Sequence, residues 1–134
     1  MKPLILVLMV LHISRGEAQI NWRATTDWKI YNPGGTDIFK LPADSLAHLR
    51  SYSLQHDSMQ QFLDTITALP RTIRPAWMGG ILASFIFNGE VHKIEISSYA
   101  GFFYDEKLKT YFQLPSESKD TWFAYLNNCL LAIE

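Results

Sequence analysis

Two β-rich runs, residues 81–87 and 90–96, stand on either side of the dipeptide Asn88-Gly89. This dipeptide predicts a β-hairpin, because both central residues of a type I′ turn need a positive φ, which Asn and Gly adopt readily. Folding the chain about the turn aligns four pairs on one face: Phe87 with Glu90, Phe85 with His92, Ala83 with Ile94, and Ile81 with Ile96. That face is apolar away from the turn and the opposite face is partly polar, so we expect one side of the sheet to meet helices.

Two other segments repeat apolar residues at the spacing of an α-helix. The first precedes Pro70 and has the stripe Met59, Phe62, Leu63, Ile66 and Leu69. The second follows Pro115 and has the stripe Trp122, Leu126, Cys129 and Ile133. Such stripes bury against a sheet, so we interpret both as core and not as parts of a cofactor site.

Shorter strands are predicted at residues 27–31, 37–42, 101–105 and 110–115. Residues 43–56 are ambiguous, although Leu46 and Leu49 suggest a short helix. The order of strands and helices lacks the regular alternation that parallel sheets require. The sequence therefore predicts an α+β fold in a single domain over residues 19–134. In it, an antiparallel β-meander of about four to six strands has helices packed on one face.

The first 18 residues have the pattern of a secretory signal peptide. Lys2 is followed by an apolar run over residues 4–11, and small residues, Gly16 and Ala18, occupy the −3 and −1 positions. We expect cleavage between Ala18 and Gln19. The apolar run would span only about 12 Å as a helix, against the roughly 30 Å of a bilayer core. The sequence thus predicts export, with no membrane anchor after the signal is removed.

Cysteine content and charge narrow the class of protein further. Cys129 is the only cysteine, which excludes an intrachain disulfide, and no Asn-x-Ser/Thr sequon occurs. Because small proteins secreted by eukaryotes are often rich in disulfides, we expect a bacterial protein, periplasmic or extracellular. Past residue 18, ten Lys and Arg stand against twelve Asp and Glu, with no run of like charge longer than two residues. This balance predicts neither nucleic-acid binding nor a polybasic membrane patch.

Signatures of catalysis and of metal binding are sparse. Cys-x-x-Cys, His-Glu-x-x-His and Gly-x-Ser-x-Gly are all missing from the sequence, and no metal or cofactor is predicted. Cys129, on an apolar stripe, is interpreted as a buried thiol. The ionisable pair that stands out is His92 with Glu90, near the tip of the hairpin on its core-side face. Two roles are open to it: general acid and base, or a polar rim that closes the end of the core.

Six aromatic rings occur between Ser98 and Phe112. Strand geometry sends neighbouring rings to opposite faces, so about half of them are expected to join the core. Five residues are predicted to bind a partner: the tyrosines Tyr99, Tyr104 and Tyr111, together with Trp77 and Arg74 of a proline-bounded connector. Tyrosine and tryptophan are amphipathic and suit contact surfaces. Ordinary cross-strand packing is the alternative interpretation of the tyrosines.

The leading hypothesis is an exported, non-catalytic binding or accessory module of the bacterial cell envelope, whose partner is a protein or an envelope polymer. Two alternatives stay open. One is a small envelope hydrolase that uses His92 and Glu90 with a serine or a water near the Asn88-Gly89 hairpin. The other is a structural subunit of a larger envelope assembly, which would expose an apolar patch.

Overall fold

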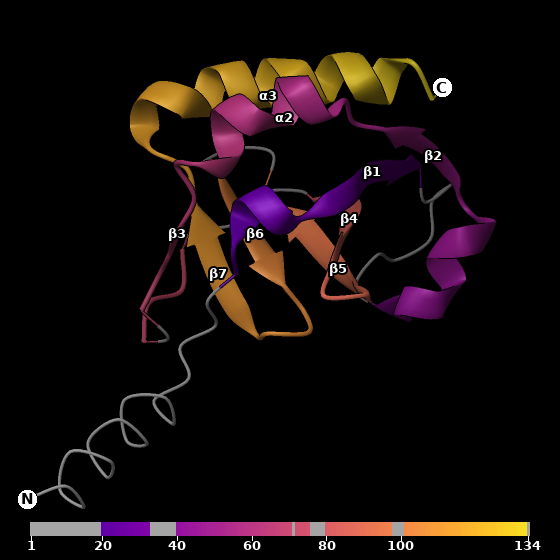
Figure 1. Cartoon of the computed structure of the whole chain (residues 1–134), viewed down its shortest axis with the longest axis horizontal. Coiled ribbons are helices and arrows are strands. Elements are labelled where there is room, and N and C mark those ends of the chain that lie inside the picture. The colour runs from indigo at the N-terminus through magenta and orange to yellow at the C-terminus, as the bar shows by residue number, and fades with distance from the viewer. Residues whose placement is uncertain (1–19, 33–39, 71, 76–79, 98–100, 134) are drawn as a thin grey trace, which may run out of the picture.

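The computed structural model of the chain describes residues 20–32, 40–70, 72–75, 80–97 and 101–133. Their strands form one antiparallel sheet in the order β2-β1-β4-β5-β6-β7-β3 (Figure 1). The strands are β1 (Thr26–Asn32), β2 (Arg50–Ser53), β3 (Thr67–Ala68), β4 (Ile81–Phe87), β5 (Glu90–Ile96), β6 (Phe102–Asp105) and β7 (Thr110–Gln113). The predicted α+β fold with an antiparallel sheet is confirmed. The sheet has seven strands where at most six were expected, because short polar strands, β2 and β3, form its two edges.

Two α-helices, α2 (His56–Leu63) and α3 (Ser116–Leu131), lie on the same side of the sheet (Figure 1). Their buried side chains belong to the two predicted stripes: Met59, Phe62 and Leu63 from α2, and Trp122, Leu126 and Cys129 from α3. The first helix is shorter than predicted. It ends at Leu63 because the residues that follow pair with β7 as strand β3.

The β4–β5 hairpin has the predicted register over its whole length, from Phe87 opposite Glu90 to Ile81 opposite Ile96. Asn88 and Gly89 have φ values of 51° and 74°, as a type I′ turn requires. The helix side of the sheet also receives Trp22, from the 3-10 helix η1 (Trp22–Ala24). Its ring centroid lies 5.0–5.6 Å from the rings of three core residues, Phe85, Phe103 and Phe112. Trp22 is half-buried and packs against the main core.

The opposite face of the sheet is covered unevenly. A second 3-10 helix, η3 (Ala43–His48), buries Leu46 against Tyr31 and Leu82 in a small second core. Over β6 and β7 the side chains of this face stay half-buried: Phe102, Tyr104, Tyr111 and Gln113.

The strand predicted at residues 37–42 is not found in its described part. Residues 37–39 lie outside the described residues, and residues 40–42 form no strand. Pro42 has no N–H to donate to a ladder, which disfavours a strand there. β1 pairs instead with β2, so that Ile30 lies opposite Tyr52. The short helix suggested by Leu46 and Leu49 corresponds to η3.

Candidate functional site

His92 and Asp105 form a buried pair between β5 and β6. Nδ1 of His92 lies 2.7 Å from Oδ2 of Asp105, and the two side chains are 4% and 0% exposed. The imidazole ring stacks on Phe85, with centroids 4.8 Å apart and planes 14° from parallel. The sequence did not reveal this contact, because it depends on the register between β5 and β6.

The second oxygen of Asp105 closes the turn between β6 and β7. Oδ1 accepts hydrogen bonds from the backbone N–H groups of Lys107 (2.9 Å) and Leu108 (3.1 Å). Aspartate commonly caps turns in this way, by bonding backbone groups two and three residues further on. The Asp105 carboxylate thus has three hydrogen-bond partners, which link β5 to the turn between β6 and β7.

Glu90 shares a strand and a face with His92 but has a different partner. Its Oε2 lies 3.1 Å from Nζ of Lys107, and its side chain is 63% exposed. The two residues predicted as an acid–base pair therefore differ in environment: His92 is enclosed and bound to Asp105, whereas Glu90 faces solvent. The two roles considered for them, general acid and base or a polar rim that closes the core, both stay predictions.

Tyr104 and Tyr111 form a cross-strand pair on the face away from the helices. They lie directly opposite each other in the β6–β7 ladder, and their ring centroids are 4.6 Å apart at an interplanar angle of 43°. At this separation the rings pack partly face against face. The pair therefore presents two outer ring faces and two phenol groups, and not one flat surface.

Burial raises the pKa of Tyr104, the negative charges of Tyr111, Glu106 and Asp105 raise it further, and the positive charge of Arg74 lowers it. We call the four half-buried side chains Phe102, Tyr104, Tyr111 and Gln113 the tyrosine surface. It brings together two of the five predicted binding residues, Tyr104 and Tyr111. Arg74 is exposed on the connector before β4, and Trp77 and Tyr99 lie outside the described residues.

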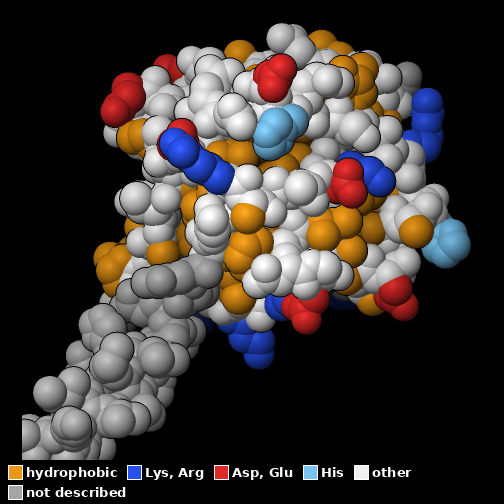
Figure 2. Space-filling model, viewed as in Figure 1, with side chains coloured by type: hydrophobic (Ala, Val, Ile, Leu, Met, Phe, Trp, Pro, Cys, Tyr) orange, Lys and Arg blue, Asp and Glu red, His pale blue; other side chains and the backbone are white. Residues whose placement is uncertain are grey.

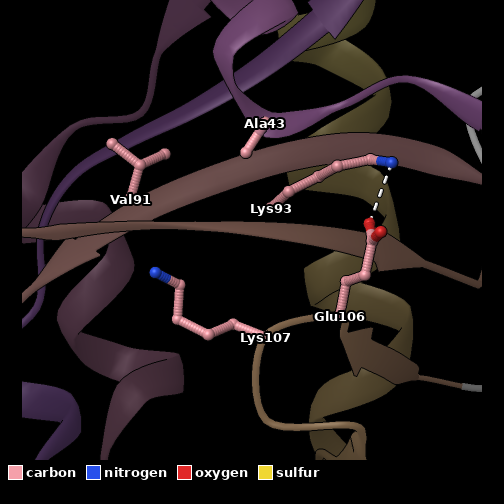
Figure 3. A pocket seen from close by; sticks show the side chains of 5 residues that line it. All are labelled: Ala43, Val91, Lys93, Glu106 and Lys107. Carbon is pink, nitrogen blue, oxygen red and sulfur yellow. Dashed lines mark ion pairs between the residues drawn. The ribbon is translucent and has the colours of Figure 1, made fainter.

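Pockets lined by described residues lie away from the tyrosine surface. One, of about 230 Å³, is lined by Ala43, Val91, Lys93, Glu106 and Lys107 (Figure 3). Lys93 is 6% exposed and its Nζ lies 2.9 Å from Glu106 and donates to the carbonyl oxygen of Leu41, while Lys107 pairs with Glu90. Both ammonium groups in this pocket are therefore already neutralised by carboxylates.

The second pocket, of about 210 Å³, is lined by Arg23, Gln60, Leu63 and Asp64. Arg23 donates two hydrogen bonds to Asp64, of 2.7 and 3.1 Å. The hydrogen bond from Arg23 lowers the pKa of the Asp64 carboxyl. Arg23 is thus paired with a carboxylate, as are both lysines of the first pocket.

The rest of the described chain adds little further chemistry. Among the described residues, no group of three or more His, Cys, Asp or Glu side chains is placed to hold a metal ion. None of the helices in these residues is long and apolar enough to cross a membrane. On the face shown in Figure 2, acidic and basic side chains are interspersed and do not gather by sign.

The chain was compared with protein-family models, with curated proteins and with solved structures, and it matches none of them.

Proposed function

We propose that this protein is an exported, non-catalytic binding module of the bacterial cell envelope, and that the tyrosine surface contacts its partner. The observation that carries the proposal is the Tyr104–Tyr111 pair, half-buried on the face opposite the α-helices. Tyrosine is among the residue types that most often anchor interfaces, because it combines a large contact area with hydrogen bonding.

The support for export comes from the sequence of residues 1–18 alone. These residues and Gln19 lie outside the described residues. The charged start, the short apolar run and the small residues before Gln19 have the order of a signal peptide. Mass spectrometry of the exported product is expected to find Gln19 at its N-terminus. Recovery of the intact N-terminus in the envelope fraction would argue against export by this route.

The environment of His92 supports a binding protein over an enzyme. A general base must come within hydrogen-bond reach of the proton that it removes. The His92 ring is almost fully enclosed, and one of its nitrogens is held by Asp105. Asp105 in turn is occupied by the turn that follows it.

The test of the proposed function is co-sedimentation of the purified protein with envelope material from its own bacterium. Tyr104→Ala and Tyr111→Ala are each expected to weaken the association by about 5- to 160-fold, corresponding to the roughly 1–3 kcal/mol of an anchoring side chain. Tyr52→Ala is the matched control, because Tyr52 is also a half-buried tyrosine but lies on edge strand β2. Urea unfolding of each variant separates loss of binding from loss of folding. Equal binding by all three variants would refute the tyrosine surface as the binding site.

A small envelope hydrolase is the second candidate, favoured by the 2.7 Å contact of His92 with Asp105. A carboxylate that holds an imidazole in this way is the arrangement that orients a catalytic base in hydrolases. In that case, substitution of His92 should abolish turnover in a folded protein, since a general base contributes a factor of about 10²–10⁴. Ester and glycoside substrates offered to the purified protein and to His92→Gln would reveal such turnover.

A further inference from the structure

The backbone of β6 and β7 brings the rings of Tyr104 and Tyr111 close together. The carbonyl oxygen of Tyr111 accepts a hydrogen bond from the N–H group of Leu69, on the side away from β6. Tyr104 and Tyr111 are therefore opposite each other as a non-hydrogen-bonded pair, the type of antiparallel pair in which side chains approach more closely. The distance of 4.6 Å between the ring centroids agrees with this backbone arrangement.

This ring contact sets the pair apart from the other tyrosines that the structure describes. Among those residues, Tyr104 and Tyr111 are the two tyrosines whose rings touch each other. Both side chains are half-buried, so the strands hold the rings in place while solvent still reaches them. Two phenols held together in this way are arranged for a reaction with each other.

The sulfur side chains of the described residues are better protected from oxidants. Met59 is 0% exposed and Cys129 is 6% exposed. Oxidation of cysteine and methionine follows their exposure, and a buried thiol is inert. A one-electron oxidant in solution therefore reaches Tyr104 and Tyr111 more readily than it reaches these two sulfurs.

The chain also lacks the usual means of linking two strands covalently. Cys129 is its only cysteine, so no disulfide can form within the chain. A bond between the rings of Tyr104 and Tyr111 would link β6 to β7, as a disulfide does in other small proteins.

We propose that Tyr104 and Tyr111 form an oxidative cross-linking site, at which a peroxide, acting through a haem peroxidase, joins the two rings as dityrosine. Each phenol gives up one electron and one proton, and the peroxide takes up both and becomes two molecules of water. The two phenoxyl radicals then form a carbon–carbon bond between ring positions next to the oxygens. Each joined carbon passes its hydrogen to the phenol oxygen, so both hydroxyl groups are restored.

The cross-link closes a short loop that contains the β6–β7 turn. Such a link restricts the unfolded chain, as a disulfide does, and thiols do not reduce a carbon–carbon bond. This inference is independent of the proposed function, because the reaction needs the two rings and an oxidant but no binding partner.

The experiment treats the purified protein with a haem peroxidase and an equimolar amount of hydrogen peroxide, in dilute solution to keep collisions between molecules rare. We expect dityrosine fluorescence and a monomer whose mass is lower by two hydrogen atoms. Trypsin cleaves after Lys107 and Lys109, which lie between the two tyrosines, so Tyr104 and Tyr111 should appear in separate peptides joined by the cross-link. A monomer without a cross-link, or with a link between other tyrosines only, would overturn the proposal.

Phenylalanine variants identify the tyrosines that react. Tyr104→Phe and Tyr111→Phe keep the packed rings but remove the hydroxyl hydrogen that the reaction takes, so each should abolish dityrosine in the monomer. Tyr52→Phe is the matched control, because Tyr52 is also half-buried but lies on β2, and it should leave the yield unchanged. Urea unfolding confirms that all three variants are folded. Undiminished dityrosine in Tyr104→Phe or Tyr111→Phe would contradict the proposal.

The same linked peptides should be present in protein isolated from the cells that produce it, after those cells are exposed to peroxide. Their absence there would overturn the assignment of the pair as a modification site, even if the purified protein reacts. None of these outcomes bears on co-sedimentation with envelope material, so the proposed function is tested separately.

Discussion

Asp105 is the residue on which the end of the sheet near the β6–β7 turn depends. One carboxylate oxygen binds His92 and the other accepts two backbone hydrogen bonds. Removing one member of a buried, hydrogen-bonded pair leaves the other without compensation in a medium that solvates it poorly. At the scale of single residues, the His92–Asp105 contact therefore predicts a loss of stability when either partner is removed.

Replacing His92 with alanine is expected to lower the free energy of unfolding by about 3 kcal/mol or more, because it breaks the buried pair and removes the ring stacked on Phe85. Glu90→Gln is the control, since an exposed ion pair contributes about 0–1 kcal/mol. Urea titrations followed by tryptophan fluorescence measure both. If the two variants were equally mild, the His92–Asp105 contact would have no structural role.

The elements that the sequence predicts well are those with a strong local signal. The β4–β5 hairpin follows from Asn88-Gly89, and the stripes of α2 and α3 follow from helical spacing. β2 and β3 were missed because they are short, exposed edge strands whose residues show no alternation of hydrophobic and polar positions. Their pairing is decided by the sheet beside them, which overrides local preference.

The candidate site, too, was predictable only where the sequence carries a local signal. Alternation along the strands separates Phe103 and Phe112, both buried, from the tyrosines of the other face. The pairing of Tyr104 with Tyr111 depends on the register across the β6–β7 turn, and the contact of His92 with Asp105 depends on the register between β5 and β6. Neither turn carries a sequence signal like Asn-Gly, so these contacts emerge only in the folded chain.

Helix α3 offers a test of the buried stripe through Cys129. Burial raises the pKa of its thiol, while a hydrogen bond with Tyr125 lowers it, and the net effect is a raised pKa. Because the thiolate is the reactive form, a raised pKa together with 6% exposure predicts slow alkylation of the native protein and fast alkylation in urea. Cys129→Ser should destabilise the fold by roughly 1–3 kcal/mol, since burying a hydroxyl in an apolar stripe costs more hydration than burying a thiol. Rapid labelling of the native protein would instead indicate a functional thiol.

At the scale of the whole molecule, one face of the sheet carries the main core, and the other face is covered only in part. The α-helices and Trp22 close one face, and η3 closes the other face over β1 and β4 (Figure 1). The tyrosine surface occupies the remaining half of that second face, on strands whose backbone edges are already paired. The large apolar side chains that are most exposed among the described residues lie on the connector, β5 and α3: Ile73, Val91, Phe123 and Leu131.

The most direct test of the tyrosine surface is hydroxyl-radical footprinting of the protein with and without envelope material from its own bacterium, read by mass spectrometry. Tyr104 and Tyr111 should both lose reactivity when the envelope is present. Phe123, which is 38% exposed on α3, should keep its reactivity and serves as the internal control. Protection of Phe123 with unchanged reactivity of the two tyrosines would place the contact on the helical side and contradict this account.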